Sequence, residues 1–174
     1  MAELEAEIAR LIREYQAKTG KLLTIGTVES ATGGRIADRI TNVPGSSDYF
    51  KGSVVAYSNA TKMGLLGVKK ATIDKYGAVS EQTALEMARC GRKLLDVDVC
   101  VSDTGIAGPS GATPDKPVGL FYLGLAAEDE SLSQKHVFQG TRERNKRDAV
   151  EAALDMLKQY LLRRLEAKGC TARL

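Results

Sequence analysis

Hydroxyl groups and glycines are concentrated in one short stretch of the chain, Glu29-Ser30-Ala31-Thr32-Gly33-Gly34. A β-branched, apolar run over residues 22–28 precedes it, and a run with helical spacing over residues 35–40 follows it. We therefore expect a turn between a buried strand and a helix. The first N–H groups of a helix lack intrahelical partners, so this turn would suit an anion such as a phosphate. The alternative is a helix cap with a glycine turn.

A lysine is the second chemical feature. Amide hydrolysis needs a nucleophile, a base and donors for the oxyanion. His136 is the only histidine and no Cys-His or Ser-His pair is evident, which leaves a hydroxyl activated by a lysine. Lys62 lies in a stretch with no acid between Asp48 and Asp74, and burial there would lower its pKa. The alternative is an exposed helix lysine.

Candidate nucleophiles and ligands lie near other predicted turns. Ser46 and Ser47 follow a Pro-Gly pair, where they would equally serve as ordinary turn residues. Arg142 is a candidate phosphate ligand, with an exposed surface arginine as the alternative. A Val-rich run ends in a third polar stretch, where glycine allows a backbone to approach a ligand closely or merely permits the path of the loop. Its candidate residues are Thr104, Gly105 and Gly108.

Helical and strand-like patterns alternate around these residues. Helices are predicted over residues 2–19, 35–40, 59–66, 70–76, 81–95 and 144–167. Strands are predicted over residues 22–28, 53–58, 97–103, 118–127 and 132–138, the last two as an antiparallel hairpin. The sequence therefore predicts the α/β class, as a single three-layer α/β/α domain with a mixed sheet over residues 1–168. Residues 169–174 are predicted to be a frayed tail.

Composition argues against several classes of protein. The 174 residues carry a net charge of only +3, with acidic and basic residues interspersed, so no nucleic-acid partner is expected. The sequence has no basic start with an apolar region and no long apolar run, which indicates a cytoplasmic protein without a membrane partner. One histidine and three cysteines without paired spacing provide no metal site, and no cofactor is implied.

Several blocks of the sequence resemble the C-terminal domain of the competence/damage-inducible protein CinA. They are Glu29–Gly34, Pro44–Phe50, Val54–Lys62, Tyr76–Ser80, Thr104–Pro109 and Lys116–Gly119. The resemblance extends from about Glu5 to about Leu162. That family includes stand-alone nicotinamide-nucleotide amidases. The resemblance therefore implies a cytoplasmic amidohydrolase that converts nicotinamide mononucleotide to nicotinate mononucleotide and ammonia in NAD salvage, and it implies a homo-oligomer.

The resemblance also implies roles for individual residues. Ser47 would be the nucleophile and Lys62 its base, while direct attack by a lysine-activated water remains an alternative mechanism. Ser30 and Tyr57 would be further catalytic residues, Ser30 by donating to the substrate and Tyr57 by orienting the base or the ring. The expected substrate-binding residues are Glu29, Thr32, Gly33, Gly34, Thr104, Gly105, Gly108 and Arg142. A second hypothesis is a catalytically silent module that binds a nucleotide or phosphate.

Overall fold

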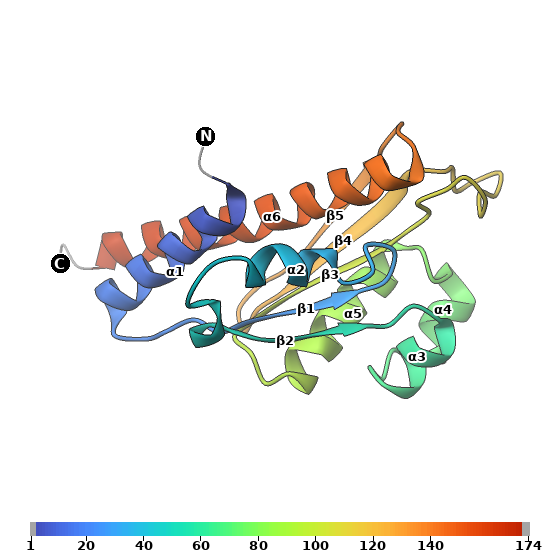
Figure 1. Ribbon diagram of the computed structural model, residues 1–174. Helices are drawn as coiled ribbons and strands as arrows, with labels where there is room; N and C mark the ends of the chain where they lie inside the picture. The colour runs from blue at the N-terminus through green and yellow to red at the C-terminus, as the bar shows by residue number, and fades with distance from the viewer. Residues whose placement is uncertain (1–2, 172–174) are drawn as a thin grey trace.

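A five-stranded sheet lies between two layers of helices in the computed structural model of the protein (Figure 1). The structure describes residues 3–171 and the side chains of residues 3–167. Three of the strands run in parallel and two are antiparallel to their neighbours, so the predicted three-layer α/β/α domain with a mixed sheet is confirmed.

The strand order places three carboxyl ends at one edge of the sheet. The strands are β1 (Ile25–Glu29), β2 (Phe50–Val55), β3 (Val99–Gly105), β4 (Leu120–Ala126) and β5 (Ser131–Val137), in the order β2-β1-β3-β4-β5. β1 pairs in parallel with both β2 and β3, whereas β4 and β5 extend the sheet as the predicted antiparallel hairpin. The chain therefore leaves β1, β2 and β3 at the same edge, where ligands of open α/β sheets gather.

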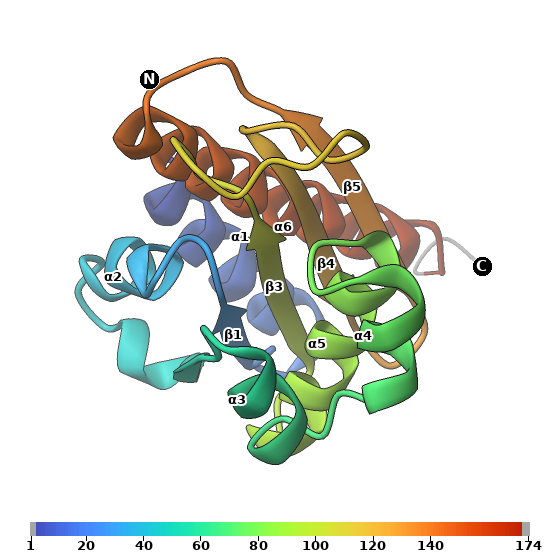
Figure 2. The same ribbon diagram turned by 90° about the vertical axis from the view of Figure 1, so that its right-hand side faces the viewer.

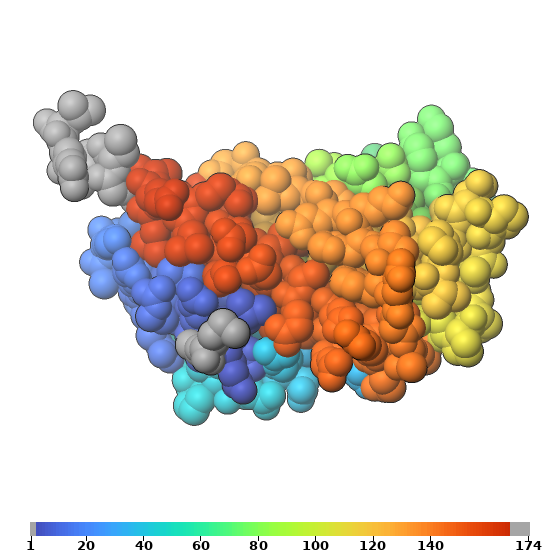
Figure 3. All heavy atoms as spheres, turned by 90° about the horizontal axis from the view of Figure 1, so that it is seen from above, coloured from blue at the N-terminus to red at the C-terminus, as the bar shows by residue number. Residues whose placement is uncertain are grey.

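Helices cover both faces of the sheet. On one face lie α1 (Leu4–Thr19), α2 (Arg35–Thr41) and the long α6 (Arg142–Thr171); on the other lies α5 (Glu81–Leu94), with the short α3 (Asn59–Gly64) and α4 (Lys70–Tyr76) beside it (Figures 1 and 2). A single 3-10 turn, η1 (Ser46–Asp48), precedes β2. Seen from outside, α6 crosses the first face next to α1 (Figure 3).

Alternation along β3 decides which polar side chains meet which helices. Val99 and Val101 pack in the core beneath α1 and α6, whereas Cys100 packs on the side of α5. Because successive side chains of a strand point to opposite faces, Asp103 lies on the face of Val101 and Thr104 on the face of Cys100. This alternation explains why Asp103 meets the turn before α2.

Several predicted boundaries move by a few residues. The second strand begins at Phe50 and ends at Val55, because the residues after Val55 form the loop into α3, which is capped by the Ser58 hydroxyl. The last helix runs from Arg142 to Thr171, so its predicted end is too early and the predicted tail begins inside it; residues 172–174 lie outside the described residues. Among the helices that the structure describes, none combines the length and apolar character needed to cross a bilayer.

Candidate active site

Lys62 and Ser30 form a buried pair where β1 and β2 end. The Lys62 side chain is only 2% exposed, and its Nζ lies 2.9 Å from Ser30 Oγ. The same nitrogen donates to the backbone carbonyls of Ala56, at 2.8 Å, and Tyr57, at 3.2 Å. Burial lowers the pKa of Lys62 from its ordinary value, opposed by the charge of the nearby Asp103.

This geometry suits a general base. A neutral amine has two N–H donors and one lone pair, and the two carbonyls can take both donors. The lone pair is then left for the third partner, the hydroxyl of Ser30. Ser30 is thus the hydroxyl that Lys62 is placed to deprotonate.

A cavity of about 230 Å³ opens above this pair. Its wall combines residues from the ends of β1 and β3, from α3 and from the loops beside them: Ser30, Ala31, Tyr57, Asn59, Lys62, Ala78, Val79, Thr104, Gly105, Ile106, Ala107, Gly108, Ser110, Gly111 and Arg142. The structure therefore brings seven of the predicted site residues together: Ser30, Tyr57, Lys62, Thr104, Gly105, Gly108 and Arg142.

Arg142 brings a positive charge to the cavity from the start of α6. Its guanidinium donates to the carbonyl of Gly108, at 2.8 Å, and to the hydroxyl of Tyr57, at 3.1 Å. No carboxylate among the side chains of residues 3–167 forms an ion pair with Arg142. Its charge therefore remains available to an anionic group of a ligand. Tyr57 links the two ends of the site, because its carbonyl contacts Lys62 and its hydroxyl contacts Arg142.

The glycines of the cavity wall are needed for packing. A Cβ at Gly105 would lie 2.4 Å from the ring of Phe121, and one at Gly108 would lie 2.5 Å from Val118. Gly108 also has a φ of +90°, which favours glycine. The hydroxyl of Thr104 donates to the carbonyl of Ala78. Thr104 and these glycines therefore line the cavity chiefly by shaping its wall.

The helix N-terminus predicted to hold a phosphate is already occupied by Glu29. The buried carboxylate of Glu29 accepts the N–H groups of Gly34 at 2.8 Å, Ile36 at 3.1 Å and Ala37 at 2.8 Å. These are three of the donors that a bound phosphate would use. The prediction of a phosphate site at this turn is therefore wrong, because a side chain of the same turn caps α2.

The neighbouring turn residues are also structural. Thr32 is completely buried, and its hydroxyl bonds to Glu29, at 2.7 Å, and to Asp103. Gly33 and Gly34 have φ values of +67° and +95°, a conformation that other residues rarely adopt. None of these residues lines the cavity. The predicted substrate-binding roles of Glu29, Thr32, Gly33 and Gly34 are corrected accordingly.

Asp103 is the residue that the sequence reasoning missed. Its carboxylate is completely buried and accepts the backbone N–H of Ser30, at 2.9 Å, and that of Thr32, at 3.2 Å. Burial raises its pKa to about 6, opposed by the hydrogen bonds from Thr32 and Ser30. An acid inside a Val-rich strand was the available signal, since buried carboxylates require partners.

Ser47, the predicted nucleophile, lies near the amino end of β2, whereas the cavity lies at the carboxyl ends of the strands. It is exposed in η1, before β2 begins, and lines a different hollow together with Arg13 and Lys51. Lys62 follows the other end of β2, and a strand of six residues spans roughly 20 Å at about 3.3 Å per residue. The predicted Ser47–Lys62 pair is therefore wrong, and Ser30 occupies the place that it required.

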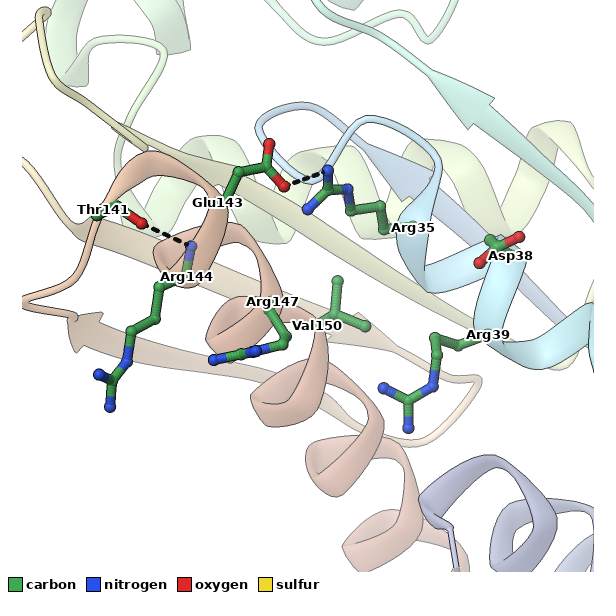
Figure 4. Close-up of a pocket in the computed structure, with 8 residues that line it drawn as sticks. All are labelled: Arg35, Asp38, Arg39, Thr141, Glu143, Arg144, Arg147 and Val150. Atoms are coloured by element: carbon green, nitrogen blue, oxygen red, sulfur yellow. Dashed lines mark hydrogen bonds and ion pairs between the residues drawn. The ribbon is translucent and has the colours of Figure 1, made fainter.

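A larger hollow between α2 and α6 contains charged side chains without a nucleophile–base pair (Figure 4). Arg35 bonds to Glu143 at 2.7 Å, and Arg39 forms ion pairs with Glu5 and Glu151. These pairs tie the helices together. The site with the chemistry of hydrolysis is thus the smaller cavity at Ser30 and Lys62.

The model of the CinA C-terminal domain family matches residues 3–161 of the chain. A CinA-like protein of Endomicrobium trichonymphae is 52% identical over 139 residues, which cover 80% of this chain and 32% of the relative. A CinA-like protein of Kosmotoga olearia is 47% identical over 159 residues, which cover 91% of this chain and 37% of the relative. The chain thus spans about a third of the length of these curated relatives.

Solved structures give the same result. The competence/damage inducible protein CihA from Agrobacterium tumefaciens superposes with a TM-score of 0.82 at 35% identity, over 90% of this chain and 94% of that one. A CinA superfamily protein from Enterobacter cloacae superposes with a TM-score of 0.84 at 28% identity, over 91% of this chain and 90% of that one. Each neighbour is covered almost completely, so the fold matches theirs over nearly their whole length.

Proposed function

Because the chain belongs to the CinA C-terminal domain family, we propose that it is an amidohydrolase that converts nicotinamide mononucleotide to nicotinate mononucleotide and ammonia. The observation that carries the proposal is the buried amine of Lys62, 2.9 Å from the hydroxyl of Ser30 at the wall of a cavity. The substrate follows from the resemblance to nicotinamide-nucleotide amidases described above.

The first half of the reaction breaks the amide bond. Ser30 Oγ attacks the carboxamide carbon while its proton passes to Lys62 Nζ, and the carbonyl electron pair moves onto the oxygen. When the tetrahedral intermediate collapses, Lys62 gives the proton to the departing nitrogen, which leaves as ammonia. The nicotinoyl group is then held as an ester on Ser30.

The second half restores the enzyme. Lys62 takes a proton from a water molecule, and the resulting hydroxide equivalent attacks the ester carbon. Collapse of the second intermediate returns the proton from Lys62 to Ser30 and releases nicotinate mononucleotide. No step needs a metal ion. The competing course, attack by a lysine-activated water on the amide itself, would use the same amine without an ester on Ser30.

Arg142 suits the nucleotide part of the substrate. Arg142 offers a guanidinium without a carboxylate partner among the described side chains, which is the chemistry that binds a phosphate. Val79, Ile106 and Ala107 line the same cavity and contribute apolar surface against which a pyridine ring can pack.

The test is release of ammonia by the purified protein from nicotinamide mononucleotide, nicotinamide riboside and nicotinamide. We expect the mononucleotide to have a kcat/KM orders of magnitude above the other two, because the phosphate contact orients the carboxamide. Tight binding of the mononucleotide without ammonia release would instead support the silent binding module. Neither binding nor turnover would reject the proposed substrate.

A further inference from the structure

The backbone N–H of Ala31 lacks an acceptor among the residues that the structure describes. It follows the Ser30 nucleophile directly, and Ala31 lines the cavity. It makes no hydrogen bond, whereas Asp103 accepts the N–H groups of Ser30 and Thr32 on either side of it. The Gly33 N–H is also unpaired among the described residues, but Gly33 does not line the cavity. An unpaired N–H at a polar site is uncommon in folded proteins and calls for an explanation.

Asp103 fixes the direction of the peptide groups on both sides of this N–H. Its carboxylate accepts the N–H of Ser30 at 2.9 Å and the N–H of Thr32 at 3.2 Å. These two donors are thereby turned toward β3. The Ala31 N–H between them does not join them at the carboxylate, although it is only one residue from each. It is held in place by its neighbours while remaining free to bond to a ligand.

We propose that the Ala31 N–H is a donor to the oxyanion that forms when Ser30 attacks a carboxamide, and that Asp103 is the residue that positions it. This inference rests on the proposed function. As the Ser30 Oγ–carbon bond forms, the carbonyl electron pair becomes an oxyanion one bond from the attacked carbon, while the serine proton moves to Lys62. An N–H one residue after the nucleophile, at a turn from strand to helix, is the arrangement used by other serine hydrolases for this purpose.

Packing around Ala31 supports this role. The Ala31 side chain is 6% exposed and belongs to a small apolar cluster with Ala107, Phe121 and Ala149. This cluster anchors the turn against β4 and α6. A donor that is rigid before the reaction begins needs no reorganisation when the charge develops, which makes it effective in stabilising a transition state.

The first test replaces single backbone amides by esters in the 174-residue chain. Incorporating lactic acid in place of Ala31 removes the N–H and keeps the methyl group. Incorporating glycolic acid in place of Gly33 is the matched control, since the Gly33 N–H also lacks a partner among the described residues but Gly33 does not line the cavity. We expect kcat to fall about 10²–10³-fold for the ester at 31, with little change in KM, and to stay close to wild type for the ester at 33.

A second test uses the unmodified protein. The aldehyde analogue of nicotinamide mononucleotide, with a pyridine-3-carbaldehyde ring, should add Ser30 reversibly to form a hemiacetal, and the amide proton of Ala31 should shift downfield in the NMR spectrum. Addition of the aldehyde without a shift at Ala31, or equal rates for the two ester variants, would overturn the assignment. If the wild type releases ammonia but the ester at 31 is fully active, only this inference fails. A wild type without activity on any pyridine carboxamide would reject the proposed function.

Discussion

The amine of Lys62 lies 2.9 Å from the hydroxyl oxygen of Ser30, although 32 positions separate the two residues in the chain. β1 and β2 produce this contact, because they run in parallel and release the chain at the same edge of the sheet. Ser30 follows β1 directly, and Lys62 lies in α3, just after β2. The pair is therefore a product of sheet topology rather than of a local motif.

Replacing the two candidate serines separately distinguishes the pair in the structure from the pair predicted from the sequence. Ser30→Ala should lower kcat for nicotinamide mononucleotide by several orders of magnitude, because it removes the atom that attacks the amide. Ser47→Ala should retain the wild-type rate, since Ser47 is exposed at the other end of β2. Steady-state ammonia release from both variants is the measurement. Wild-type activity in Ser30→Ala together with loss of activity in Ser47→Ala would reverse the assignment.

The sequence predicted the architecture well because the architecture rests on local patterns. The apolar stripes of the helices and the β-branched runs of the strands can be read residue by residue. The pairing of β1 with β2 cannot be read in this way. That pairing places Lys62 beside Ser30, whereas Ser47 lies at the other end of β2. The capping of α2 by Glu29 was missed for a related reason. A helix N-terminus is open to a ligand only if no side chain of the protein already accepts its N–H groups. Here the carboxylate of Glu29, at the end of β1, accepts them.

Lys62→Met should abolish turnover while preserving the fold. Methionine keeps an unbranched apolar stem in a site that is 2% exposed, but it removes the base. Loss of a general base lowers the rate by ~10²–10⁴-fold. Lys51→Met is the control, because Lys51 is an exposed lysine whose amine, among the described residues, hydrogen-bonds only to the carbonyl of Asp48. Circular dichroism should report folded protein for both variants. More than half of the wild-type rate in Lys62→Met would remove Lys62 from the mechanism.

The activity should rise with pH through one ionisation, because only the neutral amine of Lys62 can accept a proton from Ser30. Burial lowers the pKa of Lys62 in the folded protein, so the midpoint of kcat/KM against pH should lie below the ordinary value of 10.5. The Arg142→Gln variant should have a lower kcat/KM but the same midpoint, because the substitution does not alter the contacts of the Lys62 amine. A profile that falls with increasing pH across this range would contradict a lysine base.

The same shift has a consequence for stability. The unfolded chain holds the Lys62 proton up to its ordinary pKa of 10.5, whereas the folded protein releases it at a lower pH. Between the two values the unfolded state binds more protons, so the free energy of unfolding rises with pH across that window. Urea unfolding measures this effect. As the pH rises through that window, the free energy of unfolding of the wild type should increase relative to that of Lys62→Met. A constant difference would mean that the pKa is not lowered.

Glu29→Gln should destabilise the protein. The amide nitrogen of glutamine cannot accept the N–H groups that the Glu29 carboxylate now receives from the first turn of α2. Losing one hydrogen bond to a charged group costs about 1.5–3 kcal/mol in the free energy of unfolding. Glu143→Gln is the matched control, since Glu143 forms an exposed ion pair with Arg35, and exposed ion pairs contribute little to stability. Equal stability of the two variants would show that Glu29 does not secure the turn.

Arg142→Gln tests where the phosphate of the substrate binds. The guanidinium is positioned by Gly108 and Tyr57 and has no carboxylate partner among the described side chains, so a phosphate would supply its missing counter-charge. One hydrogen bond between charged groups contributes about 1.5–3 kcal/mol, or roughly a 10–150-fold change at 1.4 kcal/mol per tenfold. We therefore expect kcat/KM for nicotinamide mononucleotide to fall by that factor, and kcat/KM for nicotinamide riboside to remain nearly constant. Arg144→Gln is the control, because Arg144 is exposed and pairs weakly with Asp148 at 3.6 Å. An equal loss on both substrates would mean that Arg142 acts by holding Tyr57 and Gly108, and that the phosphate lies elsewhere.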